Sequence, residues 1–165
     1  MDCGFHQDGH WFRLRAAAII LDGDRVLMAR NDLDPYHYAI GGGVHHSETT
    51  EAAVRREVLE ETGLELQIQR PFFIHENFFT LSNGDPAHEL AFYFLMHFDP
   101  ARHRPRSTAS TSMDGAREWC EWVPLKDYGR LRPAYPTFLA ELLSNPPRTL
   151  CVIRTTEPSG SGPTL

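Results

Sequence analysis

Three glutamates, Glu57, Glu60 and Glu61, lie close together in a segment of good helix formers. Residues three or four positions apart share one face of a helix, so these carboxylates would repel one another. Clusters of carboxylate oxygens suit hard divalent cations such as Mg²⁺ and Mn²⁺. The spacing therefore predicts a metal site. A glutamate-rich helix seen alone is usually a solvated surface, so the prediction depends on the neighbouring residues.

Three glycines, Gly41 to Gly43, precede this helix at the end of a short strand-like run. Because glycine has no side chain, the backbone there can approach a bulky anionic ligand. Thr49 or Thr50 can cap the start of the helix, and Gly63 can end it. The segment therefore predicts a glycine-lined loop followed by a helix that carries acidic side chains.

Two further residues are spaced to brace this loop against the helix. Arg56 comes just before the acidic residues, and Glu48 lies eight residues earlier. A pair between an arginine and a carboxylate would tie the loop to the helix. Val54 and Val58 flank the acidic face and are expected in the core, which places Glu57 at the boundary between core and cleft.

At this fixed spacing the segment resembles the Nudix box of the Nudix (MutT-like) hydrolase family. The family pattern is a glycine, five residues, a glutamate, seven residues, Arg-Glu, an aliphatic residue, one residue, Glu-Glu, one residue, a glycine and an aliphatic residue. Every defined position matches, and the matching residues are Gly42, Glu48, Arg56, Glu57, Val58, Glu60, Glu61, Gly63 and Leu64. A looser resemblance extends from about residue 13 to residue 133.

The resemblance implies a metal-binding role for four residues. Glu57 and Glu61 are expected to bind Mg²⁺ (or Mn²⁺) directly, and Glu60 to bind the same ion or a second one. The carbonyl oxygen of Gly41 is expected to contribute a further ligand. Glu57 is also the candidate within the box for activating water.

Catalytic and supporting roles are implied for the remaining box residues. Arg56 is expected among the catalytic residues because it would orient the glutamates, together with Glu48. The glycines at positions 42 and 63 are expected to support the site by their backbone conformation.

The resemblance also implies the fold. The expected class is α+β, with a mixed β-sheet sandwiched between helices (α/β/α) and the box forming a loop–helix–loop. A single domain is expected over residues 11–155, after a loose N-terminus at residues 1–10 and before a disordered tail at residues 156–165. Residues 13–21 and 25–30 are expected to form a hairpin around Asp22-Gly23-Asp24.

Many members of the family use a glutamate outside the box as a metal ligand or base. Glu89 is ranked first here because it opens a strand beside a predicted hairpin, and Glu76 is a further candidate. Glu118 and Glu121 are also candidates, but both are expected to face solvent on an edge strand.

Other residues keep two interpretations. Arg13, Arg15 and Arg30 either contact phosphate or solubilise the edge of a strand. The aromatic residues that either stack on a base or belong to the core are Tyr36, Tyr38, Phe78 and Phe79.

Composition limits the partners. The chain has 165 residues, a formal net charge of −6 and a pI of about 5.8, which disfavours a nucleic-acid polymer. The three cysteines have no paired spacing, so reduced thiols are expected rather than disulfides or a zinc site. No apolar run approaches the roughly 20 residues of a transmembrane helix. The expected location is the cytoplasm, with no membrane partner, as a monomer or homodimer.

The expected reaction is the attack of water on a phosphorus atom in a nucleoside diphosphate linked to another group. Nucleoside triphosphates, including oxidised dNTPs such as oxidised dGTP, are slightly preferred as substrates over nucleotide sugars of the ADP-ribose type. The alternatives from other classes are a non-catalytic nucleotide-binding module on the same fold and a purely structural acidic helix.

Overall fold

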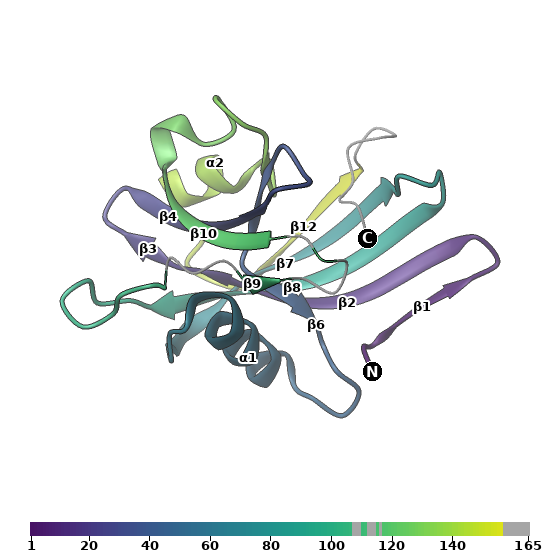
Figure 1. Ribbon diagram of the computed structural model, residues 1–165, viewed down its shortest axis with the longest axis horizontal. Helices are drawn as coiled ribbons and strands as arrows, with labels where there is room; N and C mark the ends of the chain where they lie inside the picture. The colour runs from purple at the N-terminus through teal and green to yellow at the C-terminus, as the bar shows by residue number, and fades with distance from the viewer. Residues whose placement is uncertain (107–109, 112–114, 116, 157–165) are drawn as a thin grey trace.

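The strand β2 (His10–Ile19) organises the chain, because its last residues are buried on both faces. Ala16 and Ala18 belong to a hydrophobic cluster that contains α1 (Thr50–Thr62). Ala17 and Ile19 belong to a second cluster that contains α2 (Leu139–Ser144). The computed structural model describes residues 1–106, 110–111, 115 and 117–156, and Figure 1 shows how they are arranged.

The first sheet has six strands in the order β1-β2-β8-β7-β12, with β6 also paired to β2. The pairs β2–β8 and β7–β12 are parallel and the others are antiparallel, so the sheet is mixed. The strands besides β2 are β1 (Gly4–Gln7), β6 (Gly41–Gly43), β7 (Gln67–Thr80), β8 (Pro86–His97) and β12 (Cys151–Thr156).

The second sheet also has six strands, in the order β11-β5-β4-β10-β9, with β3 paired to β4. Only the pair β5–β11 is parallel. The strands are β3 (Leu21–Asp22), β4 (Arg25–Asn31), β5 (His37–Ala39), β9 (Ser110–Thr111), β10 (Arg117–Pro124) and β11 (Ala134–Tyr135). A short 3-10 helix, Leu125–Asp127, follows β10. The α+β class is therefore confirmed, with two mixed sheets where one was expected.

The predicted hairpin between residues 13–21 and 25–30 is wrong in its extent. Of the residues before the turn, only Leu21 and Asp22 pair with β4. The strand β2 pairs instead with β1, β6 and β8 in the other sheet. The chain changes sheet at Ile20, whose carbonyl accepts a hydrogen bond from Leu27 N. A strand buried on both faces lies inside a sheet, so it needs neighbouring strands on both edges. The local turn signal could not reveal that these neighbouring strands come from distant segments.

The expectation of a loose N-terminus is also wrong for residues 4–7. These residues form β1, which pairs with β2 in the register Gly4↔Arg13, although all four are exposed. Before it, Cys3 N donates to Val44 O, and Met1 O accepts from His46 N. Backbone hydrogen bonds, and not burial of apolar side chains, order this segment. Its sequence therefore has no apolar pattern that would predict a strand. At the other end Thr156 completes β12, and residues 157–165 lie outside the described residues.

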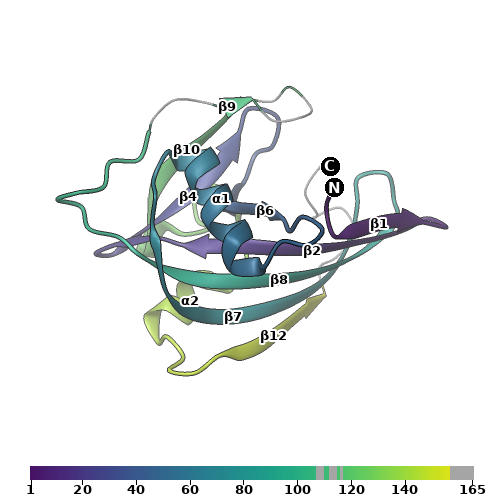
Figure 2. The same ribbon diagram turned by 90° about the horizontal axis from the view of Figure 1, so that it is seen from below.

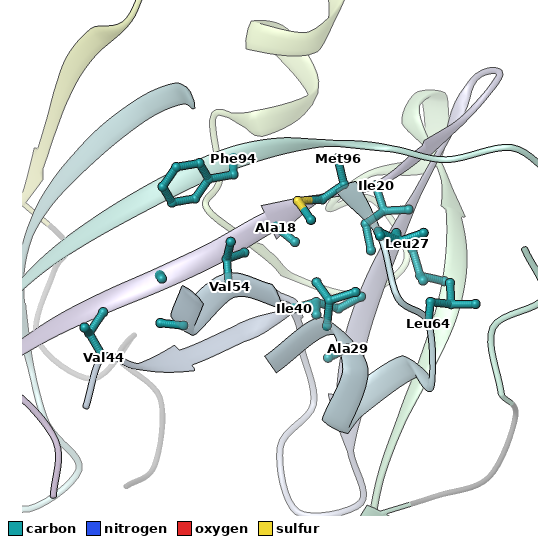
Figure 3. Close-up of a cluster of buried hydrophobic side chains, with 14 residues drawn as sticks. Ala18, Ile20, Leu27, Ala29, Ile40, Val44, Val54, Leu64, Phe94 and Met96 are labelled. Carbon is teal, nitrogen blue, oxygen red and sulfur yellow. The ribbon is translucent and has the colours of Figure 1, made fainter. Parts of the chain in front are cut away.

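The cluster around α1 joins the two sheets. Ala53, Val54 and Val58 of the helix pack against apolar residues of β2, β4 and β8, which include Ala18, Leu27 and Phe94 (Figure 3). Removing this apolar surface from water is the main term that holds the helix in place. Figure 2 shows α1 lying across β2 and β6, both of which it contacts.

Both ends of α1 follow the predicted caps. The Thr49 side chain accepts a hydrogen bond from Ala52 N, and Gly63 adopts a left-handed φ of 72° while its N–H bonds to Leu59 O. The α1 helix has 13 residues and α2 has six. In the described part of the chain, no helix is long and apolar enough to cross a membrane.

We expect Gly63→Ala to lower the free energy of unfolding by about 1–2 kcal/mol, because an L residue is strained at positive φ. An added Cβ would also lie 2.5 Å from Cδ of Arg106. Gly129 is the matched control, since it has the same φ of 72° and nothing within 4 Å of an added Cβ. Urea unfolding should show a greater loss for Gly63→Ala than for Gly129→Ala, and Arg106→Ala should remove the excess. Equal losses in both variants would contradict a role for the Arg106 contact.

Candidate active site

The glycine strand β6 brings the backbone next to the acidic face of α1. It pairs with β2 in the register Ala16↔Gly42 and Ala17↔Gly41. Residues 44–49 then lead from β6 into the helix. The predicted loop before the helix is thus partly a strand, and its pairing fixes where the glycines lie.

Gly42 leaves the space that the Glu57 carboxylate occupies. A Cβ added at Gly42 would lie 2.5 Å from Oε1 of Glu57, closer than a normal contact. The Glu57 side chain is 15% exposed and forms an ion pair with Arg56. Burial raises the pKa of Glu57, and the hydrogen bond from Arg56 opposes this effect. The first defined glycine of the box therefore leaves the place that the Glu57 carboxylate occupies.

Glu61 faces the same strand. Its carboxylate accepts a hydrogen bond from Gly41 N at 2.8 Å. Burial raises the pKa of Glu61 to about 8, against the effect of the Gly41 hydrogen bond, and the charge of Glu57 adds to the increase. Without a cation, this carboxyl group is therefore mostly protonated at neutral pH.

Arg56 ties the loop to the helix, as predicted. Its Nε donates to Oε1 of Glu48 at 3.0 Å, and its Nη2 donates to Oε2 of Glu48 and to the Gly43 carbonyl, both at 3.0 Å. The hydrogen bonds from Arg56 lower the pKa of Glu48 to about 2. Nη1 of Arg56 lies 3.4 Å from Glu60, whose side chain is 59% exposed. Arg56 therefore contacts two of the three box glutamates on α1.

The Gly41 carbonyl, predicted as a metal ligand, accepts a hydrogen bond from Nη2 of Arg15 at 3.0 Å. Within the described residues, no group of three or more His, Cys, Asp or Glu side chains is arranged to hold a metal ion. The structure brings Glu57 and Glu61 to the glycine strand, but each carboxylate is turned toward an N–H donor.

The glutamates outside the box lie in different surroundings. Glu89 is buried and accepts hydrogen bonds from Nε and Nη2 of Arg13. Glu76 of β7 pairs with Arg154 of β12 and His88 of β8, its two neighbouring strands in the first sheet. Both carboxylates therefore have basic partners of their own.

The expectation that Glu118 faces solvent on an edge strand is wrong. It lies on β10 where the strand pairs with β4 on one side and with β9 on the other, and it accepts a hydrogen bond from the Tyr38 hydroxyl at 2.9 Å. At Glu121, among the described residues, β10 pairs with β4 alone. The Glu121 side chain binds His37 and is 38% exposed, so the expected edge position holds for this residue.

Glu118 is the outside glutamate that faces the box. It shares a face of β10 with Cys120, whose Sγ lies 3.8 Å from the carbonyl oxygen of Glu61. The charge of Glu118 is also among the causes that raise the pKa of Glu61. Sequence reasoning named this residue but ranked it low, because the local sequence does not show that this face of β10 meets α1.

The aromatic residues that could stack on a base or belong to the core lie mostly away from the box. Tyr36 is buried edge-on against Tyr135 and Tyr38. Phe79 belongs to a small apolar cluster, and Phe78 stacks on His88. Only Tyr38 among these aromatic residues reaches the vicinity of the box, through Glu118.

Comparison with known proteins agrees with this geometry. The family model described as NUDIX domain matches residues 11–144. None of the curated protein sequences matches the chain. Among solved structures, a MutT NUDIX hydrolase from Burkholderia pseudomallei is 25% identical, with a TM-score of 0.59 over 78% of this chain and 95% of that one.

Two further structures share the fold at lower identity. A MutT protein from Bacillus halodurans is 19% identical, with a TM-score of 0.65 over 87% of this chain and 90% of that one. An ADP-ribose pyrophosphatase from Streptococcus suis is 18% identical, with a TM-score of 0.54 over 86% and 98%. Since the family model spans most of the chain, including the box and both strands that frame it, the protein belongs to the NUDIX domain family and is a Nudix hydrolase that acts on phosphoanhydrides.

Proposed function

We propose that the protein is a Mg²⁺-dependent pyrophosphohydrolase that cleaves a phosphoanhydride bond in a nucleoside diphosphate-linked substrate. The observation that carries the proposal is the packing of two carboxylates, Glu57 and Glu61, against the glycine strand, where burial raises the pKa of both. Carboxyl groups held so close together favour the binding of a cation that would ionise them.

The donor set fits Mg²⁺, or Mn²⁺, rather than a softer metal. Glu57, Glu60 and Glu61 offer only oxygen ligands, and the Gly41 carbonyl would add another. A bound divalent ion lowers the pKa of water and neutralises charge on phosphoryl oxygens. To bind the ion, Glu61 would leave Gly41 N, while Glu57 would offer Oε2 with its Oε1 still on Arg56.

The remaining box residues act by position. Arg56 orients Glu57 and Glu60, and Glu48 holds Arg56 against the Gly43 carbonyl. Gly42 leaves room for Glu57, and Gly63 ends the helix just beyond Glu61. These contacts support the proposed assignment of Arg56 as a catalytic residue and of Glu48, Gly42 and Gly63 as supporting ones.

We propose two carboxylates as candidates to take the proton of the attacking water. Glu57 is the candidate within the box, and Glu118 becomes the leading candidate outside it. The hydroxyl of Tyr38 holds the Glu118 carboxylate in place. Glu89 is a weaker candidate, because its ion pair with Arg13 lowers its pKa against the effect of burial.

We propose a nucleoside triphosphate, possibly an oxidised dNTP, as the substrate, with a nucleotide sugar of the ADP-ribose type as the second candidate. The full set of box carboxylates supports catalysis over a role as a nucleotide-binding module. We place the protein in the cytoplasm as a monomer or homodimer.

A nucleotide panel with Mg²⁺, scored by released phosphate products, tests the proposed function. We expect turnover of at least one nucleoside triphosphate or nucleotide sugar and its complete loss in EDTA. Glu61→Gln should reduce kcat by about 100-fold or more, as expected for a group that binds or activates a reactant. Glu51→Gln is the matched control, because Glu51 is exposed in the first turn of the same helix. Equal activity of the two variants would refute the role of Glu61.

The role of Glu118 can be tested separately. We expect Glu118→Gln to lower kcat by about 100-fold, with little change in KM, if this carboxylate accepts the proton. The acid limb of the pH profile of kcat should change with it. Glu121→Gln is the control on the opposite face of β10 and should keep kcat within about twofold of the wild type. A Glu118→Gln enzyme with wild-type kcat would leave Glu57 as the leading candidate base, ahead of Glu89.

The raised pKa of Glu61 predicts how the stability of the metal-free protein depends on pH. The folded protein keeps the Glu61 proton up to about pH 8, while the unfolded chain loses it near 4.5. Protons bound only by the folded state mean that the free energy of unfolding falls as pH rises. His75, whose pKa burial lowers to about 4, makes the free energy of unfolding rise with pH instead. Most of that rise is over by pH 6.5, the value for an unfolded histidine.

Urea unfolding in EDTA should therefore show wild-type stability falling from pH 6.5 to 8, by up to a few kcal/mol since one pKa unit is worth about 1.4 kcal/mol. The Glu61→Gln variant should lose much less over the same range. Stabilisation by Mg²⁺ should grow with pH in the wild type, because binding needs ionised carboxylates. Parallel pH curves for the two proteins would contradict the raised pKa.

A further inference from the structure

Arg15 lies on β2 directly beside the glycine strand. It pairs with Gly43 of β6 and with Ala91 of β8. Its Nη2 donates hydrogen bonds to two backbone oxygens, Ala39 O at 2.7 Å and Gly41 O at 3.0 Å. The guanidinium group is therefore held against the backbone that leads into the box.

One donor of this guanidinium group has no partner. Its Nε is buried and has no hydrogen-bond partner. Both hydrogen bonds that Arg15 makes to described residues leave from Nη2. A guanidinium can donate from every nitrogen, and buried donors in proteins are nearly always paired. An unpaired Nε–H next to a candidate active site therefore indicates a group that an acceptor outside the protein can satisfy.

The neighbouring arginine on the same face of β2 has a different environment. Arg13 donates from Nε at 2.9 Å and from Nη2 at 2.5 Å to the carboxylate of Glu89. Arg15 has no such partner: no ion pair involves it in the part of the chain that the structure describes. The charge of Arg13 is matched within the protein, and the charge of Arg15 is not.

Arg30 also has a buried Nε without a partner. It lies in the second sheet, where its Nη1 is 3.5 Å from Glu121 and its guanidinium covers the ring of Trp119. A carboxylate and an aromatic ring thus already meet its charge. Arg30 is therefore a weaker candidate than Arg15.

The carboxylates around Arg15 are bound to other donors. Glu89 accepts its hydrogen bonds from Arg13, Glu61 accepts from Gly41 N, and Glu57 pairs with Arg56. None of these three carboxylates forms an ion pair with Arg15, so its Nε–H is left without an acceptor from them.

We propose that Arg15 binds a non-bridging phosphoryl oxygen of the substrate through its unpaired Nε–H, while its Nη2 stays on the Ala39 and Gly41 carbonyls. The ligand class is a diphosphate, and the inference rests on the proposed hydrolysis of a nucleoside diphosphate-linked substrate. Arginine is well suited to this role because its donors are rigidly placed and always charged. One side chain thereby joins the substrate to the Gly41 carbonyl, a proposed metal ligand.

Binding of methylenediphosphonate tests this without turnover, since its P–C–P bridge cannot be hydrolysed. We expect Arg15→Lys to weaken calorimetric binding of methylenediphosphonate to the Mn²⁺-loaded protein by about tenfold or more, as for the loss of a charge-assisted hydrogen bond. Mn²⁺ affinity, measured alone, should stay within about twofold. In turnover of a panel substrate the same variant should raise KM more than it lowers kcat.

Arg13→Lys is the matched control, because it changes an arginine on the same face that is already paired with Glu89. It should leave the affinity for methylenediphosphonate within about twofold of the wild type. Unchanged affinity in Arg15→Lys, or equal losses in both variants, would overturn the proposal and leave Arg15 a structural residue that holds two carbonyls.

NMR of the wild-type protein gives a second test that needs no variant to fold. With arginine-labelled protein and Mg²⁺, the Nε–H resonance of Arg15 should shift on addition of methylenediphosphonate, while that of Arg13 should stay in place. An Arg15 signal that does not move at saturation would overturn the proposal. Neither result depends on hydrolysis, so a panel without turnover would sink the proposed function and not the anion site.

Discussion

The Glu57 carboxylate lies where a side chain on Gly42 would be, so the missing side chain decides where this carboxylate can lie. A Cβ at Gly42 would displace the carboxylate, which is the flexible end of Glu57. Beside it, Glu61 bonds to Gly41 N and Arg56 bonds to the Gly43 carbonyl. The apolar cluster beneath α1 pulls the helix toward the sheets, and the missing side chain lets the acidic face reach the backbone. Burial and close approach therefore act together to crowd these carboxylates.

That crowding makes the metal-free site electrostatically unfavourable. Arg56 is committed to Glu48, Glu57 and the Gly43 carbonyl, so it offsets only part of the negative charge. Protonation of Glu61 is the remaining way to reduce the repulsion without a cation. A divalent ion would replace both the proton and part of the role of Arg56. With such an ion bound, an acidic protein would present a cation to which phosphate could bind.

The parts of this structure that depend on local chemistry could be predicted from the sequence. The ends of α1 follow from a threonine that caps the first turn and a glycine that adopts a left-handed conformation at the last. The Arg56–Glu48 pair follows from spacing within one segment. Pairing between distant segments could not be predicted in this way. Tandem strands suggested a hairpin for β2, which instead joins β8, and exposed residues 4–7 gave no sign of β1. Glu118 was ranked low because its neighbours in sequence do not reveal that α1 faces it.

The arginines show how paired and unpaired charges separate structural from functional roles. A buried arginine that has lost its hydration needs either a carboxylate or hydrogen-bond acceptors in return. Arg13 has Glu89, and Arg56 has Glu48 and Glu57, so their charges serve the fold and the box. Arg15 has two neutral carbonyls and an unpaired Nε, and the carboxylates around it are bound to other donors. The same argument leaves a place for an anion beside Arg15. In a phosphoanhydride hydrolase the substrate supplies it.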